Sequence, residues 1–218
     1  TSQSDYDYLS VHVAPIKDIF MMKPQKPKIR RCPDFVSYEL GHFLHLLKKG
    51  SYNLLPILYG PVVLNTETEW GKKIRENRAK FLSEAMITSI FGYVKSQMKA
   101  YEMGRRMKGN DTAKALATAY RELMVGINLL SNKPENFELE LSSFQRERYL
   151  EIRFCTDWDK SYKRLKTAYE LNRITIEYRQ KGPWALQETV DDDFLWDLCY
   201  QIRIGIAGLK ETECIQYK

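Results

Sequence analysis

The sequence lacks the features of several large classes of protein. Its longest apolar run, residues 85–93, is interrupted by Thr and Ser and falls short of the ~18 residues that a membrane helix needs. The first eight residues are polar and acidic, so we expect no signal peptide there. Its four scattered cysteines form no Cys-x-x-Cys pair, which favours a reduced, cytoplasmic protein with buried thiols.

The short motifs of common enzyme families are missing as well. There is no Gly-x-Ser-x-Gly, no P-loop and no Gly-x-Gly-x-x-Gly anywhere in the chain. Serine hydrolases, Walker-type ATPases and Rossmann dehydrogenases therefore find no support. No internal repeat or low-complexity tract is present either.

What the chain does contain is typical of a basic globular protein. Its 218 residues are 44% hydrophobic and 28% charged, which suits one mid-sized domain or a small domain with a helical appendage. The 34 Lys and Arg residues exceed the 28 Asp and Glu residues, giving a net charge of +6. Cations gather in residues 23–31, 72–80 and 105–108. Such clusters indicate a nucleic-acid or nucleotide partner, although each is also typical of a solvated surface.

Hydrophobic periodicity predicts a small β-rich front followed by a helical body. Residues 6–13 and 34–38 alternate as strands do, and the proline-containing basic segment 23–31 between them is expected to be an extended, exposed loop. An apolar stripe after Glu39 predicts a helix that Gly50 ends. We therefore expect an α+β fold, with a small mixed sheet in residues 1–65 and a mainly helical domain in residues 66–218.

Within the helical part, the same periodicity gives a set of separate elements. Residues 173–178 fit either a strand or the tail of the helix before them. The predicted helices span residues 81–99, 113–130, 143–154, 157–171 and 191–209.

Paired carboxylates near the start of the chain are the clearest chemical signal. Asp5 and Asp7 lie two residues apart in a predicted strand, so both point to one face. Adjacent carboxylates repel unless a cation lies between them, and their oxygens suit Mg²⁺ or Mn²⁺. Asp34 begins the second strand and joins them if the strands are neighbours, which gives the ligand set of two-metal phosphoryl transfer. The alternative interpretation of Asp-x-Asp is a turn or a helix cap.

The stretch Ser4-Asp5-Tyr6-Asp7-Tyr8 resembles the predicted nucleotidyltransferases of the RNA-ligase-associated (RlaP-type) family, in the DNA polymerase β superfamily. The resemblance covers most of the chain. It continues through Asp34-Phe-Val-Ser-Tyr-Glu39, Arg75-Glu-Asn-Arg78, Phe81-Leu-Ser83 and Lys114 with Arg121. It implies an enzyme that moves a nucleoside monophosphate from a nucleoside triphosphate to an acceptor hydroxyl, using a divalent metal.

The resemblance also implies roles for particular residues. It makes the three carboxylates both the catalytic and the metal-binding groups: Asp5, Asp7 and Asp34. Candidates for binding the triphosphate are Ser4, Arg75, Arg78 and Lys114, with a surface salt bridge as the alternative role of each cation. The superfamily's Gly-Ser pair, which binds the triphosphate, is missing ahead of Asp5. We expect a further N-terminal segment that carries it, and the alternative is a protein that has lost this means of binding the nucleotide.

The acceptor is less closely defined than the chemistry. The basic segment and the family's association favour RNA, and no membrane partner or particular oligomeric state is indicated. Two other interpretations stay open: a non-catalytic, RNA-binding relic of the fold, and a nucleotidyltransferase that modifies protein hydroxyls with the same three acids. A purely helical interaction protein would leave the paired acids unexplained.

Overall fold

The computed structural model describes residues 8–21, 27–31, 34–61, 68–104, 110–179 and 186–208, with the backbone alone at residues 30, 31, 34, 110, 111 and 174–179. Packing divides the chain into two compact units, Thr1–Phe81 with Val190–Lys218 and Leu82–Thr189. The boundaries of these units differ from the predicted domain boundary between residues 65 and 66. The predicted domains, 1–65 for the catalytic part and 66–218 for the helical part, remain a prediction.

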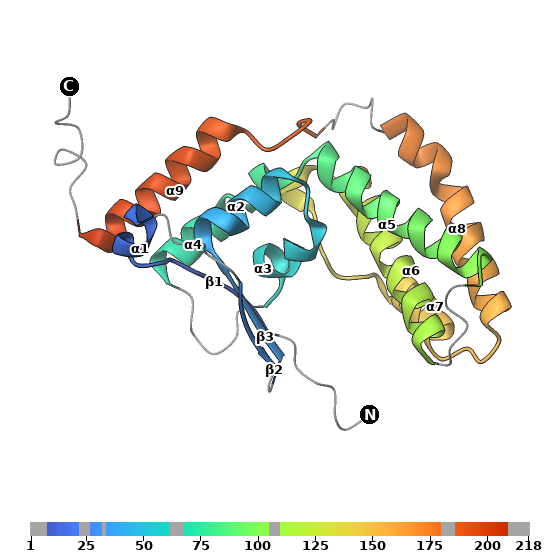
Figure 1. The fold of residues 1–218 in the computed structure, drawn as a ribbon. Helices are drawn as coiled ribbons and strands as arrows, with labels where there is room; N and C mark the ends of the chain where they lie inside the picture. The colour runs from blue at the N-terminus through green and yellow to red at the C-terminus, as the bar shows by residue number, and fades with distance from the viewer. Residues whose placement is uncertain are drawn as a thin grey trace. The chain divides into compact units, whose positions relative to one another are not determined.

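The first unit contains a mixed three-stranded sheet in the order β1–β3–β2 (Figure 1). β1 (Tyr8–His12) runs parallel to β3 (Asp34–Glu39), and β2 (Lys28–Arg31) runs antiparallel to β3. A small mixed sheet followed by helices confirms the predicted α+β class. The expectation of a loop throughout residues 23–31 was wrong for residues 28–31, because their backbone pairs with β3.

Helices pack beside this sheet and supply the core of the first unit. They are α1 (Ile16–Phe20), α2 (Leu40–Lys48), α3 (Leu55–Tyr59), α4 (Glu69–Glu76) and α9 (Asp192–Ala207), with 3₁₀ turns at Tyr52–Leu54 and Arg78–Phe81. α2 forms as predicted: Leu40, Phe43 and Leu47 are fully buried on one stripe. Gly50, with φ of 74°, follows the end of α2, where a left-handed backbone favours glycine.

The second unit is a helical bundle built around α6 (Asn110–Ser131). α6 packs against α5 (Glu84–Glu102), α7 (Ser143–Arg153) and α8 (Trp158–Arg179), and the 3₁₀ turn Pro134–Asn136 follows it (Figure 1). The four predicted helices of this region are confirmed, and residues 173–178 are the tail of α8. Within the described helices, none has both the length and the apolar character needed to cross a bilayer.

Candidate functional site

The predicted catalytic residues fall at the edge of what the structure describes. Ser4, Asp5 and Asp7 lie outside the described residues, and Asp34 is placed by its backbone at the first position of β3. The described part of the chain contains no group of three or more His, Cys, Asp or Glu side chains that would hold a metal ion. The side chains of Asp5, Asp7 and Asp34 are not among those described, so the metal site stays a prediction.

The pairing of β1 with β3 fixes the setting of this end of the sheet. The two strands are parallel, and Tyr8 lies opposite Phe35. Asp7 directly precedes Tyr8 in the sequence, as Asp34 directly precedes Phe35. Asp34 in turn lies opposite Arg31 of β2. Both strands therefore begin at the same end of the sheet: β1 begins directly after Asp7 in the sequence, and β3 begins at Asp34.

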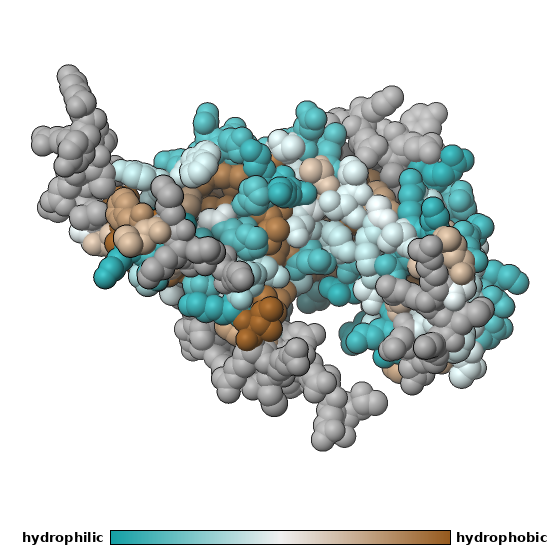
Figure 2. Space-filling view, in the orientation of Figure 1, coloured by the Kyte–Doolittle hydropathy of each residue, from teal (hydrophilic) through white to brown (hydrophobic). Residues whose placement is uncertain are grey.

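The two faces of the sheet differ in burial. Leu9, Val36 and Ile29 lie in one cross-strand row, in which Leu9 is 37% and Ile29 71% exposed. We call the face of this row the open face, and Figure 2 shows hydrophobic colour over the strands. Ser37 and Glu39 alternate with Val36 and are each 3% exposed, on the covered face that packs against the helices.

A histidine joins the two parallel strands on the covered face. His12 Nδ1 and Ser37 Oγ lie 2.9 Å apart in a hydrogen bond between β1 and β3. Burial lowers the pKa of His12, the Lys28 cation lowers it further, and Glu39 opposes both effects. A neutral imidazole is therefore favoured here, and its hydrogen bond joins β1 to β3.

The two arginine candidates of the first unit both border α3. The Arg75 guanidinium donates to Ile57 O at 3.2 Å and to Gly60 O at 2.8 Å, carbonyls at the end of a helix that need donors. Arg78 lies over the ring of Tyr59, 4.8 Å from its centroid. The structure thus brings these two residues together and gives Arg75 a clear packing role. Triphosphate binding by either stays a prediction.

Lys114 belongs to the second unit, on α6. Its side chain is exposed, and its carbonyl accepts a hydrogen bond from Thr118 Oγ1 at 2.8 Å. On the same helix, Glu122 is 9% exposed, and Arg121 approaches it to 3.7 Å. Burial raises the pKa of Glu122, and Arg121 opposes part of that shift.

A buried ion pair in the first unit was missed by the sequence analysis. Glu39, at the end of β3, accepts from Arg203 Nη2 of α9 at 2.9 Å and from the backbone amide of Gly41 at 2.7 Å. Arg203 also borders a cavity of about 480 Å³ between α2 and α9. The residues lining this cavity are Gly41, Leu44, His45, Lys48, Asp192, Leu195, Trp196, Cys199, Tyr200 and Arg203. None of them is a predicted site residue. The one signal for Arg203 in the sequence was a cation between Ile202 and Ile204.

The comparisons with known proteins add one finding. A family model described as RlaP, RNA repair pathway DNA polymerase beta family, matches residues 1–153. The match includes the whole sheet and runs through α7, well over half of the chain. No curated protein and no solved structure matched the chain.

Proposed function

The chain belongs to the RNA repair pathway DNA polymerase beta family, and from that premise we propose that it is a metal-dependent nucleotidyltransferase. It moves a nucleoside monophosphate from a nucleoside triphosphate to an acceptor hydroxyl, with RNA as the favoured acceptor and the cytoplasm as the place of action. Membership of the family supports the nucleotidyltransferase type of function. The metal, the acceptor and the residue roles are our inference.

The single observation that carries the proposal is the parallel register of β1 and β3. Because Tyr8 lies opposite Phe35, continuing the pairing by one residue brings position 7 opposite position 34. Neighbouring strands lie about 4.8 Å apart, which suits two carboxylates that share a cation. We propose that the alternation of β1 continues back to positions 5 and 7, which share the period of Leu9. Position 34 shares the period of Val36, so the proposal assigns all three acids to the open face.

The donor set fits the proposed metals, because three carboxylates offer the hard oxygen ligands that Mg²⁺ and Mn²⁺ prefer. Two such ions, when bound, neutralise the charge that develops on the transferring phosphoryl group. In the proposed step, the acceptor oxygen forms a bond to the α-phosphorus, and the bond from that phosphorus to the bridging oxygen breaks, releasing pyrophosphate. We assign to Asp34 the acceptance of the proton from the attacking hydroxyl.

In this proposal the cationic side chains bind the triphosphate, together with Ser4, which directly precedes Asp5 in the sequence. Of the two arginines near α3, we assign the contact first to Arg78, because Arg75 already donates to two carbonyls. Arg78 is half-buried against Tyr59, which preorganises its guanidinium. Lys114 is exposed on α6 of the second unit, and triphosphate binding by it stays a prediction.

Transfer of label from α-³²P nucleoside triphosphates tests the proposal. The full chain is incubated with Mg²⁺ and either single-stranded RNA or protein acceptors, and Asp7→Asn and Asp34→Asn are compared with it. We expect labelled RNA from the unchanged chain and at least a hundredfold loss in both variants. Asp193→Asn, an exposed carboxylate in the first turn of α9, is the matched control and should retain activity.

Two results would redirect the assignment. Label on protein rather than RNA would favour the protein-modifying enzyme. No transfer by the unchanged chain, together with RNA binding that survives both substitutions and needs no metal, would favour the non-catalytic relic.

A further inference from the structure

Arginines lie over exposed phenylalanines on α7, in the second unit. Phe144 is 64% and Phe154 71% exposed, large values for aromatic side chains. The Arg148 guanidinium carbon is 5.2 Å from the centroid of Phe144, and that of Arg153 is 5.7 Å from the centroid of Phe154. Each ring therefore has a cation beside it and a remaining surface turned to solvent.

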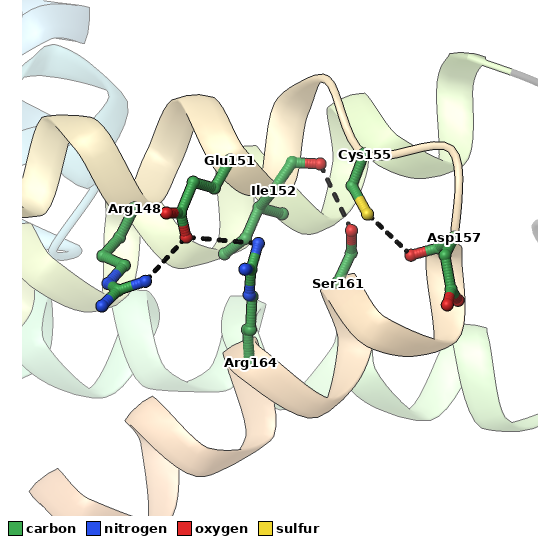
Figure 3. Close-up of polar contacts among 7 residues, drawn as sticks. All are labelled: Arg148, Glu151, Ile152, Cys155, Asp157, Ser161 and Arg164. Carbon is green, nitrogen blue, oxygen red and sulfur yellow. Dashed lines mark hydrogen bonds and ion pairs between the residues drawn. The ribbon is translucent and has the colours of Figure 1, made fainter.

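An ion-pair network holds the arginines of this region in place (Figure 3). Glu151 Oε2 accepts from Arg148 Nη1 at 2.8 Å and lies 3.2 Å from Arg164 Nη1 of α8. The carboxylate thus fixes two guanidinium groups from two helices side by side. Arginines held in this way lose less side-chain entropy when a ligand binds than freely rotating ones do.

The turn that joins α7 to α8 is itself braced. The buried hydroxyl of Ser161 donates to Ile152 O at 3.4 Å, and Cys155 Sγ donates to Asp157 O at 3.1 Å (Figure 3). Ile152 is the buried residue of α7, with 1% of its surface exposed. One side of α7 therefore anchors the helix, and the rest of its surface is left to solvent.

Charge and aromatic character combine on the solvent side. Residues 143–166 contain seven Lys and Arg residues and four Asp and Glu residues, so the segment is cationic by three charges. One of the four acids, Glu151, is engaged by two arginines. We define the α7–α8 surface by exposed and half-buried residues on the side of α7 that carries Glu151, together with Arg164 of α8: Phe144, Arg148, Phe154 and Arg164.

We propose that the α7–α8 surface binds single-stranded RNA. The cations meet the phosphates, and unpaired bases stack on the free faces of Phe144 and Phe154. Any polyanion would complement the positive charge of this surface. The exposed rings, however, stack on unpaired bases, and a duplex keeps its bases stacked on one another. The inference rests on the proposed function, because RNA is the acceptor proposed there.

Fluorescence anisotropy with a labelled single-stranded RNA tests the inference on the full chain. We expect Phe144→Ala and Phe154→Ala each to weaken binding about fivefold or more, as loss of a stacking platform does. Arg164→Gln should lower the steepness of the salt dependence by about 0.7, the slope of one phosphate contact on a single strand. Leu171→Ala is the matched control, since Leu171 is 74% exposed on α8 but lies outside the surface.

Unchanged affinity in both phenylalanine variants would overturn the inference, as would equal affinity for duplex RNA or stronger binding to anionic lipid vesicles. Asp7→Asn separates this inference from the proposed function. RNA bound through the surface, with no nucleotide transfer by the unchanged chain, would sustain the inference and refute the enzyme. Transfer to RNA that the phenylalanine substitutions leave unaffected would do the reverse.

Discussion

At the scale of single residues, Glu39 is a buried carboxylate with two structural roles. It is 3% exposed, and its oxygens accept from the amide of Gly41 at the start of α2 and from Arg203 of α9. A charge removed from water in this way is tolerated because it is both paired and hydrogen-bonded. The residue therefore links the sheet, α2 and α9 within the first unit.

Replacement of Glu39 measures that link. Glu39→Ala removes the helix cap and leaves Arg203 without its carboxylate, so we expect a loss of about 2–4 kcal/mol in the free energy of unfolding. Glu39→Gln keeps an oxygen for the cap and should lose less. Urea unfolding of both variants, with Arg203→Ala to complete a double-mutant cycle, checks the values. A loss in Glu39→Ala that equals the cap alone, about 1 kcal/mol, would contradict a stabilising ion pair.

Glu122 gives a second prediction, in which pH is the variable. Burial raises the pKa of Glu122 in the folded chain, so the folded chain binds this proton more tightly than the unfolded chain does. Its stabilising contribution is full below the unfolded pKa of about 4.3 and is lost as pH rises through the folded value. Glu122→Gln should therefore be more stable than the unchanged chain at pH 7–8, by about 1 kcal/mol. The gap should close on acidification towards pH 4, and urea unfolding that shows it widening would contradict this account.

At the scale of elements, the long helices with a clear hydrophobic period were predictable from the sequence. Short helices, and a strand that forms only by pairing with a distant one, were not. The apolar stripe of α2 and the helices of the second unit follow from their own sequences, and the structure confirms them. β2 was missed because residues 28–31 look like part of a basic, proline-rich loop and become a strand by pairing with β3. α1 and α3, five residues each, are too short to show a period.

The packing of α6 against α5 yields a matched pair of glycine substitutions. A Cβ at Gly126 would meet Ile90 Cγ2 at 3.0 Å and Phe91 Cζ at 3.2 Å, whereas a Cβ at Gly92 of α5 meets nothing within 4 Å. Gly92→Ala should stabilise by about 0.5–1 kcal/mol through helix propensity. Gly126→Ala gains the same propensity but overpacks a buried contact, for a net loss of about 1 kcal/mol. Thermal unfolding of both tests this, and equal stabilisation would show that α5 and α6 separate freely.

At the scale of the whole molecule, the sequence allowed prediction of the α+β class and the family, while the geometry of the site came only in part. The parallel pairing that brings β1 beside β3 is a tertiary fact that no local pattern contains. The same holds for Glu39 and Arg203, which meet across 164 residues. The sequence offered triphosphate binding or a surface salt bridge as the role of Arg75, and it did not predict that Arg75 donates to the carbonyls at the end of α3.

The measurement that tests the central claim most directly is a calorimetric titration of ATP, GTP, CTP and UTP into the full chain, with and without Mg²⁺. We predict binding of at least one triphosphate that requires Mg²⁺ and is lost in Asp7→Asn and in Asp34→Asn, because these acids are the proposed metal ligands. Asp193→Asn should bind as the unchanged chain does. Triphosphate binding that is indifferent to Mg²⁺ and unchanged in both variants would contradict a metal-dependent nucleotidyltransferase.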